Sequence, residues 1–166
     1  MNNYAYIDNQ NLYLATKRAP EPWTVDMKRF RVYLREKYKV ERAYLFMGAY
    51  EDKYKDLYDK YLSFGYELRF RQHLESIKSK KKGNVDTDVV FQMLFDSFYE
   101  DQFDKVILVS GDGDYFKTVQ HLLKINRLER VLLPSRKNAS SLYKALAENR
   151  KALLDRTDVK RKIKRK

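Results

Sequence analysis

A short, continuously apolar run, Lys105–Ser110 (KVILVS), constrains the fold more than any other feature of the sequence. It is rich in β-branched residues, a pattern typical of a strand buried on both faces of a parallel sheet. Comparable short runs alternate with amphipathic segments along the chain. The expected strands are 4–7, 42–47, 66–70, 105–110, 130–133 and 151–154, and the expected helices are 24–38, 52–64, 85–99, 115–124 and 140–149. This alternation predicts an α/β fold, a three-layer α/β/α sandwich with a mainly parallel central sheet.

The length of 166 residues fits a single domain. We expect residues 1–155 to form this domain and residues 156–166 to form a basic, disordered C-terminal tail. The absence of cysteine excludes disulfide scaffolds, zinc held by cysteines and thiol nucleophiles. The apolar runs fall far short of the roughly 18 residues that a membrane span needs, and the N-terminus does not have the pattern of a signal peptide. We therefore expect a cytoplasmic protein with no membrane partner.

The formal net charge of +12 is concentrated in two segments. Residues 69–82 hold six Lys or Arg against one Glu, and residues 156–166 hold seven against one Asp. Such segments favour nucleic acid as a partner, and the alternative is a solvated tail with a basic loop. A further basic pair precedes an expected helix N-terminus, where anions bind readily. The predicted nucleic-acid-binding residues are Arg69, Arg71, Lys78, Lys80, Lys81, Lys82, Arg136, Lys137, Lys160, Arg161 and Lys162.

Acidic residues follow two expected strands and open one expected helix. They are Asp8 after the first strand, Asp86 and Asp88 at the helix start, and Asp112 and Asp114 after the strand at 105–110. Since ligands of open parallel sheets bind beyond the carboxyl ends of the strands, we expect these side chains to converge there. Clustered carboxylates suit Mg²⁺, and a metal would reverse their charge toward a polyanion.

Each acidic segment also has a purely structural interpretation. Asp8 with Asn11, or Asp114 alone, could cap the helix that follows, and carboxylates in the first turn of a helix are favourable in any case. Asp86 and Asp88 point about 200° apart on a helix, so at most one of them faces the cleft squarely. Ser110 either contacts a phosphate or shapes the turn after its strand.

These segments resemble the motifs of the NYN domain, a PIN-like group that includes the LabA/DUF88-like proteins. The resemblance rests on Asp8-x-x-Asn11 after the first strand, on Lys82-Gly83-Asn84-Val85-Asp86 at a helix start, and on Ser110-Gly111-Asp112-Gly113-Asp114-Tyr115 after an apolar strand. It runs from about Tyr4 to Leu154. The family usually has phenylalanine where this chain has Tyr115.

Members of that family are similar to PIN-domain nucleases, which have a Rossmann-like sheet and an acidic pocket, use Mg²⁺ or Mn²⁺, and usually act on RNA. The resemblance implies that Asp8, Asp86, Asp112 and Asp114 are the metal-binding and catalytic carboxylates, with Asn11 as a polar helper. We therefore expect a metal-dependent endoribonuclease. The alternative is a non-catalytic RNA-binding or nucleic-acid-binding module on the same fold. The choice between RNA and DNA, the preferred metal and the oligomeric state, a homodimer included, stay open.

Overall fold

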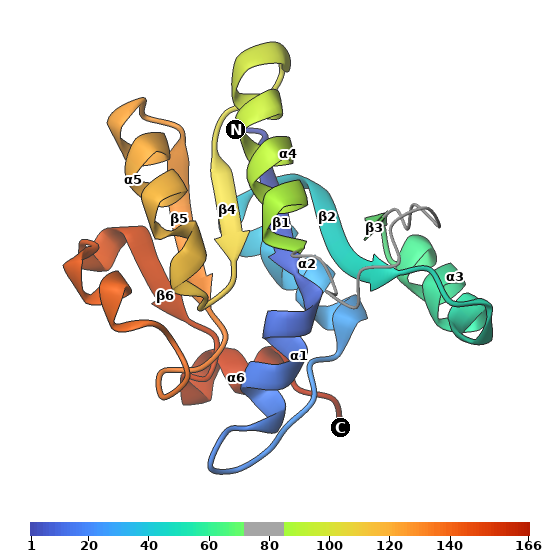
Figure 1. Cartoon of the computed structure of the whole chain (residues 1–166). Coiled ribbons are helices and arrows are strands. Elements are labelled where there is room, and N and C mark those ends of the chain that lie inside the picture. Colours follow the sequence, from blue (N-terminus) through green and yellow to red (C-terminus); the bar gives the residue numbers. More distant parts are fainter. Residues whose placement is uncertain (72–84) are drawn as a thin grey trace, which may run out of the picture.

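The computed structural model describes residues 1–71 and 85–166. In this part of the chain, six strands form one sheet in the order β3-β2-β1-β4-β5-β6, and every pair of neighbouring strands is parallel. Figure 1 shows these strands with the helices around them. The strands are β1 (Asn3–Asp8), β2 (Val40–Ala49), β3 (Tyr66–Arg71), β4 (Val106–Val109), β5 (Leu128–Leu133) and β6 (Lys151–Leu153). The predicted three-layer α/β/α sandwich with a parallel sheet is confirmed.

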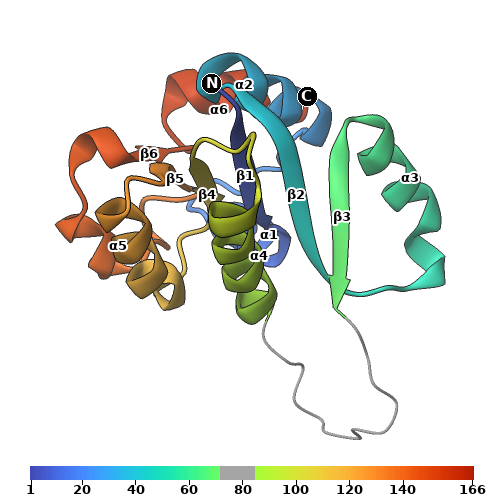
Figure 2. The same ribbon diagram turned by 90° about the horizontal axis from the view of Figure 1, so that it is seen from above.

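Helices cover both faces of the sheet. Figure 2 shows α2 and α6 on one face and α4 and α5 on the other, with α3 beside the edge strand β3. The helix α1 joins the α2 and α6 side through Leu12, which belongs to the same buried cluster as Phe30 and Ile163. The helices are α1 (Asn9–Lys17), α2 (Met27–Tyr38), α3 (Lys55–Ser63), α4 (Val85–Tyr99), α5 (Phe116–Lys124) and α6 (Thr157–Ile163). Within the described residues, no helix is long and apolar enough to cross a membrane.

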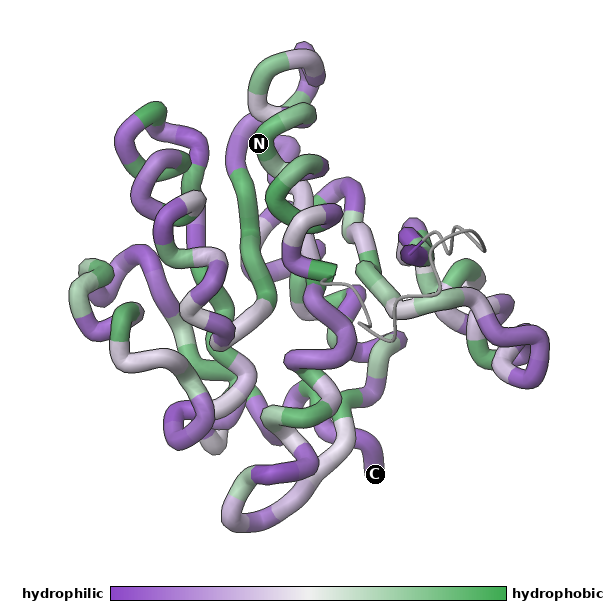
Figure 3. Tube along the Cα trace, in the orientation of Figure 1, coloured by the Kyte–Doolittle hydropathy of each residue, from purple (hydrophilic) through white to green (hydrophobic). Residues whose placement is uncertain are grey.

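The strands divide their side chains between two cores. Along β1, Ala5 and Ile7 pack toward α1 and α2, while Tyr4 and Tyr6 pack toward α4 and α5, because successive side chains of a strand point to opposite faces. All four residues of β4 are buried, and this strand is the long hydrophobic stretch near the middle of Figure 3. The continuously apolar sequence of β4 therefore reflects its central position between two helical layers.

The described structure differs from the sequence prediction at 140–149. The sequence predicts an α-helix there, but the chain forms two short 3₁₀ helices, η3 (Ser141–Ala145) and η4 (Glu148–Arg150). Leu146 and Ala147 have extended backbone between them. This break lets Tyr143 and Leu146 both reach the core, where they are 1% and 6% exposed. The short helix α1 was also not predicted, since its sequence is mostly polar.

The predicted disordered tail at 156–166 is wrong, because most of this segment forms α6. Val159 and Ile163, four residues apart on one face of the helix, are buried against α2. The backbone continues the packing: the Asp26 N–H donates to the Ile163 carbonyl at 2.7 Å, and the Arg165 N–H donates to the Thr24 carbonyl at 2.8 Å. Two apolar side chains at helical spacing thus order a segment whose composition is otherwise strongly basic.

Candidate active site

The carboxyl ends of β1 and β4 form the centre of the candidate site. Along the chain, β1 to β3 extend the sheet in one direction and β4 to β6 extend it in the other, so the order reverses between β1 and β4. Such a topological switch point is where open α/β sheets bind ligands. Because Ile7 pairs with Val109, Asp8 and the turn 110–114 leave the sheet side by side. The expected meeting of these two acidic segments at one sheet edge is therefore observed.

Three carboxylates meet at this edge. Asp86 in the first turn of α4, together with Asp112 and Asp114 after β4, each place one carboxylate oxygen within 4.8 Å of the other two. We call these three residues the acidic cluster. Asp86 and Asp112 are partly buried and Asp114 is exposed, so the cluster lies at the surface of the molecule. Asp88, the other candidate on α4, is exposed and lies outside the cluster.

The turn after β4 is held by hydrogen bonds that fix Asp112. The Ser110 hydroxyl accepts from the Asp112 N–H at 3.1 Å, and the Asp112 carboxylate accepts from the Asp114 N–H at 2.9 Å. Asp112 thereby caps the 3₁₀ helix η2 (Gly113–Tyr115). From the other side, the Tyr143 hydroxyl donates to the Asp112 carbonyl at 2.6 Å. Ser110 thus shapes the turn, which is the second of the two interpretations given for it above.

Gly113 packs closely against Ser140. A Cβ built there would lie 2.6 Å from the Ser140 hydroxyl and 3.1 Å from the Leu142 side chain, so a larger residue would require Ser140 to move. The adjacent Gly111 donates its N–H to the Asn11 side-chain oxygen at 2.9 Å. Asn11 therefore connects α1 to the turn that carries Asp112.

Asp8 lies beside the acidic cluster but not within the group of three. Its side chain is almost fully enclosed, and the residue is 5% exposed. One carboxylate oxygen accepts from the Asn11 N–H at 3.1 Å, which caps α1, and the other accepts from the Tyr115 hydroxyl at 3.0 Å. Burial raises the pKa of Asp8, while the hydrogen bonds from Asn11 and Tyr115 oppose this shift. Asp8 therefore caps α1 with one carboxylate oxygen and contacts Tyr115 with the other.

Tyr115 connects Asp8 to the acidic cluster, and the sequence did not reveal it. Its ring is fully buried, and its hydroxyl lies 2.8 Å from an Asp86 carboxylate oxygen as well as 3.0 Å from Asp8. A phenol carries one proton, so the two carboxylates share a single donor. Burial, followed by the charge of Asp8, raises the pKa of Tyr115 and keeps the phenol neutral. Its one signal in the sequence is the departure from the usual phenylalanine of the resembling family.

The predicted basic residues fall into several places. Arg69 and Arg71 lie on β3, where Arg69 pairs with Glu67 at 3.4 Å. The ammonium of Lys160, on α6, lies 5.4 Å from the centre of the Trp23 ring, so it takes part in the packing of α6 against the domain. Arg136, Lys137 and Lys162 line a cavity near β6, and Arg161 is exposed on α6. The other predicted basic residues of the segment 69–82 lie outside the described residues: Lys78, Lys80, Lys81 and Lys82.

The chemistry of the acidic cluster suits a hard divalent cation. Its donors are carboxylate oxygens alone, the ligand type that Mg²⁺ and Mn²⁺ prefer over nitrogen and sulfur. Three carboxylates at this spacing repel one another, and a divalent cation between them removes that repulsion. The hydrogen bonds at Asp86 and Asp112 fix two of the three side chains before any ion binds. The residues present therefore fit a Mg²⁺ or Mn²⁺ site.

Comparison with known proteins places this arrangement in a family. A model of the NYN domain matches residues 4–150. The low amplitude and bright protein LabA of Synechococcus elongatus is 27% identical over 126 residues, which cover 70% of this chain. They cover 65% of LabA, so the chain spans slightly less than two thirds of that relative.

A solved structure shares the fold. The crystal structure of VPA0982, a protein of unknown function from Vibrio parahaemolyticus, superimposes with a TM-score of 0.77 at 21% identity. The superposition covers 93% of each chain. The fold is thus shared over nearly the whole length, and the NYN match spans most of the residues that build the sheet and the acidic cluster. The chain belongs to the NYN domain family.

Proposed function

We propose that the protein is a metal-dependent nuclease that cleaves phosphodiester bonds of RNA. The observation that carries the proposal is the acidic cluster at the topological switch point, in a chain of the NYN domain family. The overall charge of +12 supports a polyanionic substrate. A cluster of carboxylates in such a basic protein is otherwise unfavourable for a polyanion, and a bound cation resolves this conflict.

In the proposed mechanism, Asp86, Asp112 and Asp114 would hold Mg²⁺ or Mn²⁺. Such an ion would supply Lewis-acid polarisation of the phosphate and would make water more acidic. The protein positions these ligands in advance: Tyr115 holds Asp86, and the Asp114 N–H with Tyr143 fixes Asp112. Asp8 acts in this proposal as the anchor of the Tyr115 hydroxyl.

The test is cleavage of labelled single-stranded RNA and DNA with Mg²⁺, with Mn²⁺ and with EDTA. α4 offers a matched pair of variants, since Asp86 belongs to the acidic cluster and Asp88, two residues later, does not. Both are Asp→Asn changes in the first turn of one helix. We expect D86N and D112N to lose metal-dependent RNA cleavage by at least about 100-fold, or about 2.7 kcal/mol of transition-state stabilisation, and D88N to retain it.

Three results would each contradict a part of the proposal. Equal trace cleavage by wild type, D86N and D112N identifies that activity as contamination, and the alternative of a non-catalytic RNA-binding module then replaces the nuclease. An equal loss of cleavage in D86N and D88N would show that the negative charge of this helix turn is needed, but that no specific metal ligand is present at Asp86. Cleavage of DNA but not RNA would agree with phosphodiester cleavage at this site and would contradict RNA as the substrate.

A further inference from the structure

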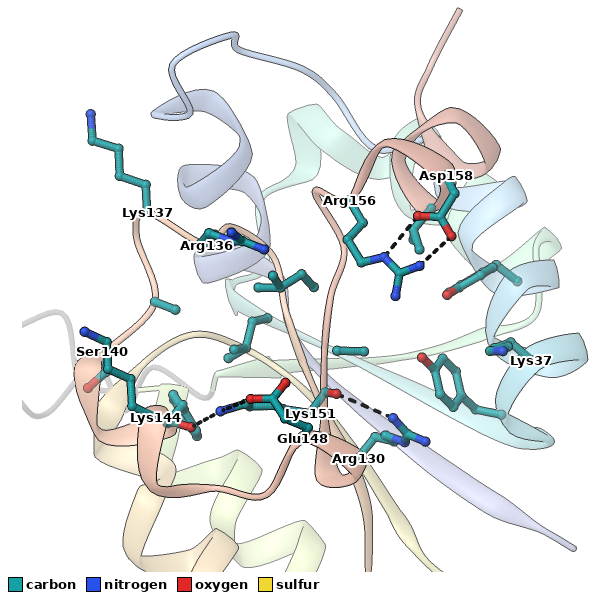
Figure 4. A pocket seen from close by; sticks show the side chains of 18 of the residues that line it. Lys37, Arg130, Arg136, Lys137, Ser140, Lys144, Glu148, Lys151, Arg156 and Asp158 are labelled. Carbon is teal, nitrogen blue, oxygen red and sulfur yellow. Dashed lines mark hydrogen bonds and ion pairs between the residues drawn. The ribbon is translucent and has the colours of Figure 1, made fainter.

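A second site of opposite charge lies on the other side of the turn that carries the acidic cluster. It is a cavity of about 730 Å³ between α2, β6, α6 and the loop 134–141. This volume is within the range of roughly 300–1,000 Å³ that is common for ligand sites. Figure 4 shows the cavity, with Lys37 on one side, Ser140 and Lys144 on the opposite side, and Arg156 above. We call it the basic cavity.

Cations dominate the lining of the basic cavity. Two are neutralised locally: Arg156 pairs with Asp158 at 2.9 Å, and Lys151 pairs with Glu148 at 3.3 Å. The Nε of Arg130 is buried and has no hydrogen-bond partner among the described residues. Five further cations line the cavity without a carboxylate partner in that part of the chain: Lys37, Arg136, Lys137, Lys144 and Lys162.

This lining comes from separate elements of the fold. Lys37 is on α2, Lys144 on η3 and Lys162 on α6, while Arg136 and Lys137 belong to the loop after β5. Like charges on separate elements repel one another, and the folded chain has to hold them together. A concave surface that concentrates positive charge in this way attracts an anionic ligand.

The basic cavity and the acidic cluster share a wall. Tyr143 lines the cavity, and its hydroxyl donates to the carbonyl of Asp112. Ala139 and Ser140 also line the cavity and lie 3.2 Å and 2.6 Å from the positions where Gly111 and Gly113 would carry a Cβ. A bound polymer that extends from the acidic cluster across this loop would therefore enter the basic cavity directly.

Aromatic rings add a second kind of contact. Tyr33 and Tyr38 line the cavity from α2, with their ring centres 5.9 Å apart. Phosphate contacts from Lys and Arg, combined with aromatic faces for bases, are the usual means of holding single-stranded nucleic acid. A cavity of this volume admits unstacked nucleotides, whereas a duplex is recognised across broad grooves.

We propose that the basic cavity binds the segment of single-stranded RNA that adjoins the bond to be cleaved. The strand follows the 134–141 loop from the acidic cluster, its phosphates contact Lys37, Lys144 and Lys162, and a base faces Tyr33. This inference deepens the proposed function, and it takes RNA as the ligand from that function. The geometry of the cavity and its shared wall supply the path of the strand.

The test measures binding apart from cleavage. The D112N protein is titrated with a fluorescein-labelled single-stranded RNA oligonucleotide in EDTA, over a series of salt concentrations. The cavity variant adds K37Q and K144Q, which remove two exposed cations from opposite walls. The control variant adds K60Q and K124Q, which remove two exposed cations from the last turns of α3 and α5, outside the cavity.

We expect the cavity variant to bind RNA at least about tenfold more weakly at moderate salt, and the control variant to bind as the parent does. The slope of log affinity against log salt should become shallower by about 0.7 for each phosphate that the cavity variant no longer neutralises. Equal affinities and slopes for the cavity and control variants would overturn the inference. An equal loss of duplex RNA binding would also overturn it, because the cavity would then attract any polyanion and would not distinguish single-stranded from double-stranded RNA.

Competition separates an RNA site from a small-anion site. Inorganic phosphate or a nucleoside monophosphate is added as a competitor. If either displaces the RNA at concentrations far below those that screen electrostatic attraction in general, the cavity is a pocket for a small ligand, and the proposed path of the RNA strand is wrong. The inference fails independently of the proposed function. If wild type cleaves RNA but the cavity variant binds like the control, only the cavity proposal falls. If RNA binding depends on the cavity but no cleavage occurs, only the nuclease proposal falls.

Discussion

At the scale of single residues, the candidate site depends on one hydroxyl group. Tyr115 is buried, and its hydroxyl lies within hydrogen-bonding distance of both Asp8 and Asp86. Unlike Asp86, Tyr115 does not belong to the acidic cluster. In the proposed function its hydroxyl therefore positions a carboxylate, and this differs from binding a metal itself. The two contributions can be separated by experiment.

We predict that Y115F lowers the free energy of unfolding by about 1.5 kcal/mol, because a buried hydrogen bond to charged groups is removed while the ring stays. The variant should still gain thermal stability from Mg²⁺, since the three carboxylates remain. D112N should lose that gain while keeping its turn, because an Asn oxygen can also accept from the Asp114 N–H. Thermal melts with and without Mg²⁺ measure both effects. A Y115F protein that no longer responds to Mg²⁺ would place the hydroxyl among the ligands.

At the scale of elements, α6 closes the fold against α2. Ile163 is fully buried, and Val25 and Lys164 form an antiparallel bridge beside it. The segment thus contributes to the core that supports one face of the sheet, and it also supplies Lys162 to the basic cavity. Removing it would change both stability and charge, so point variants are more informative than a deletion.

We predict that I163A lowers the free energy of unfolding by about 3 kcal/mol, because it leaves a cavity in the core. R161A, an exposed change on the same helix, should alter stability by less than about 0.5 kcal/mol. Chemical denaturation of both variants provides the comparison. Equal and small effects would show that α6 does not pack on the domain in solution and that the tail is disordered after all.

A second element-scale contact pins β2 to the edge strand β3. Arg42 on β2 donates two hydrogen bonds to Glu67 on β3, at 2.8 and 2.9 Å. The Arg42 guanidinium holds the pKa of Glu67 below its usual range. The pair is about one-third exposed, so solvent screens it and limits its contribution.

We predict that E67Q lowers stability by about 0.5 kcal/mol at neutral pH. Since the folded-state pKa of Glu67 is depressed, the contribution is present above the unfolded pKa and is lost as pH falls through the folded pKa. The difference between wild type and E67Q should therefore vanish in acid. E51Q, which removes an exposed pair with Lys53, serves as the control and should change stability little. If the difference in free energy of unfolding between wild type and E67Q persists in acid, the stabilisation does not come from the ion pair of Glu67 with Arg42.

At the scale of the whole molecule, the sheet and its acidic edge could be predicted because they depend on short, regular patterns. The apolar β4 sequence and the placement of Asp8 and Asp112 after strands follow from strand periodicity and parallel topology. Helical spacing alone could not decide between Asp86 and Asp88, since the choice depends on how α4 is rotated against the sheet, and only the resemblance to the NYN domain favoured Asp86. The bridge at Tyr115 depends on tertiary distances between three distant segments.

At residues 156–166 the prediction differed from the structure because it gave more weight to composition than to the spacing of apolar residues. The strong basic charge of residues 156–166 suggested disorder, but Val159 and Ile163 at helical spacing were enough to order α6. Two of these basic residues, Arg156 and Lys162, line the basic cavity. The molecule thus combines a small negative site with a larger positive one on the two sides of a single loop.

An anomalous difference map of crystals grown with Mn²⁺ shows whether Asp86, Asp112 and Asp114 bind a divalent cation, as we propose. We predict one or two Mn²⁺ peaks in contact with these carboxylates, and their disappearance in crystals of D112N grown under the same conditions. Absence of a peak between the three carboxylates in wild-type crystals, at a Mn²⁺ concentration that supports RNA cleavage in solution, would contradict the account.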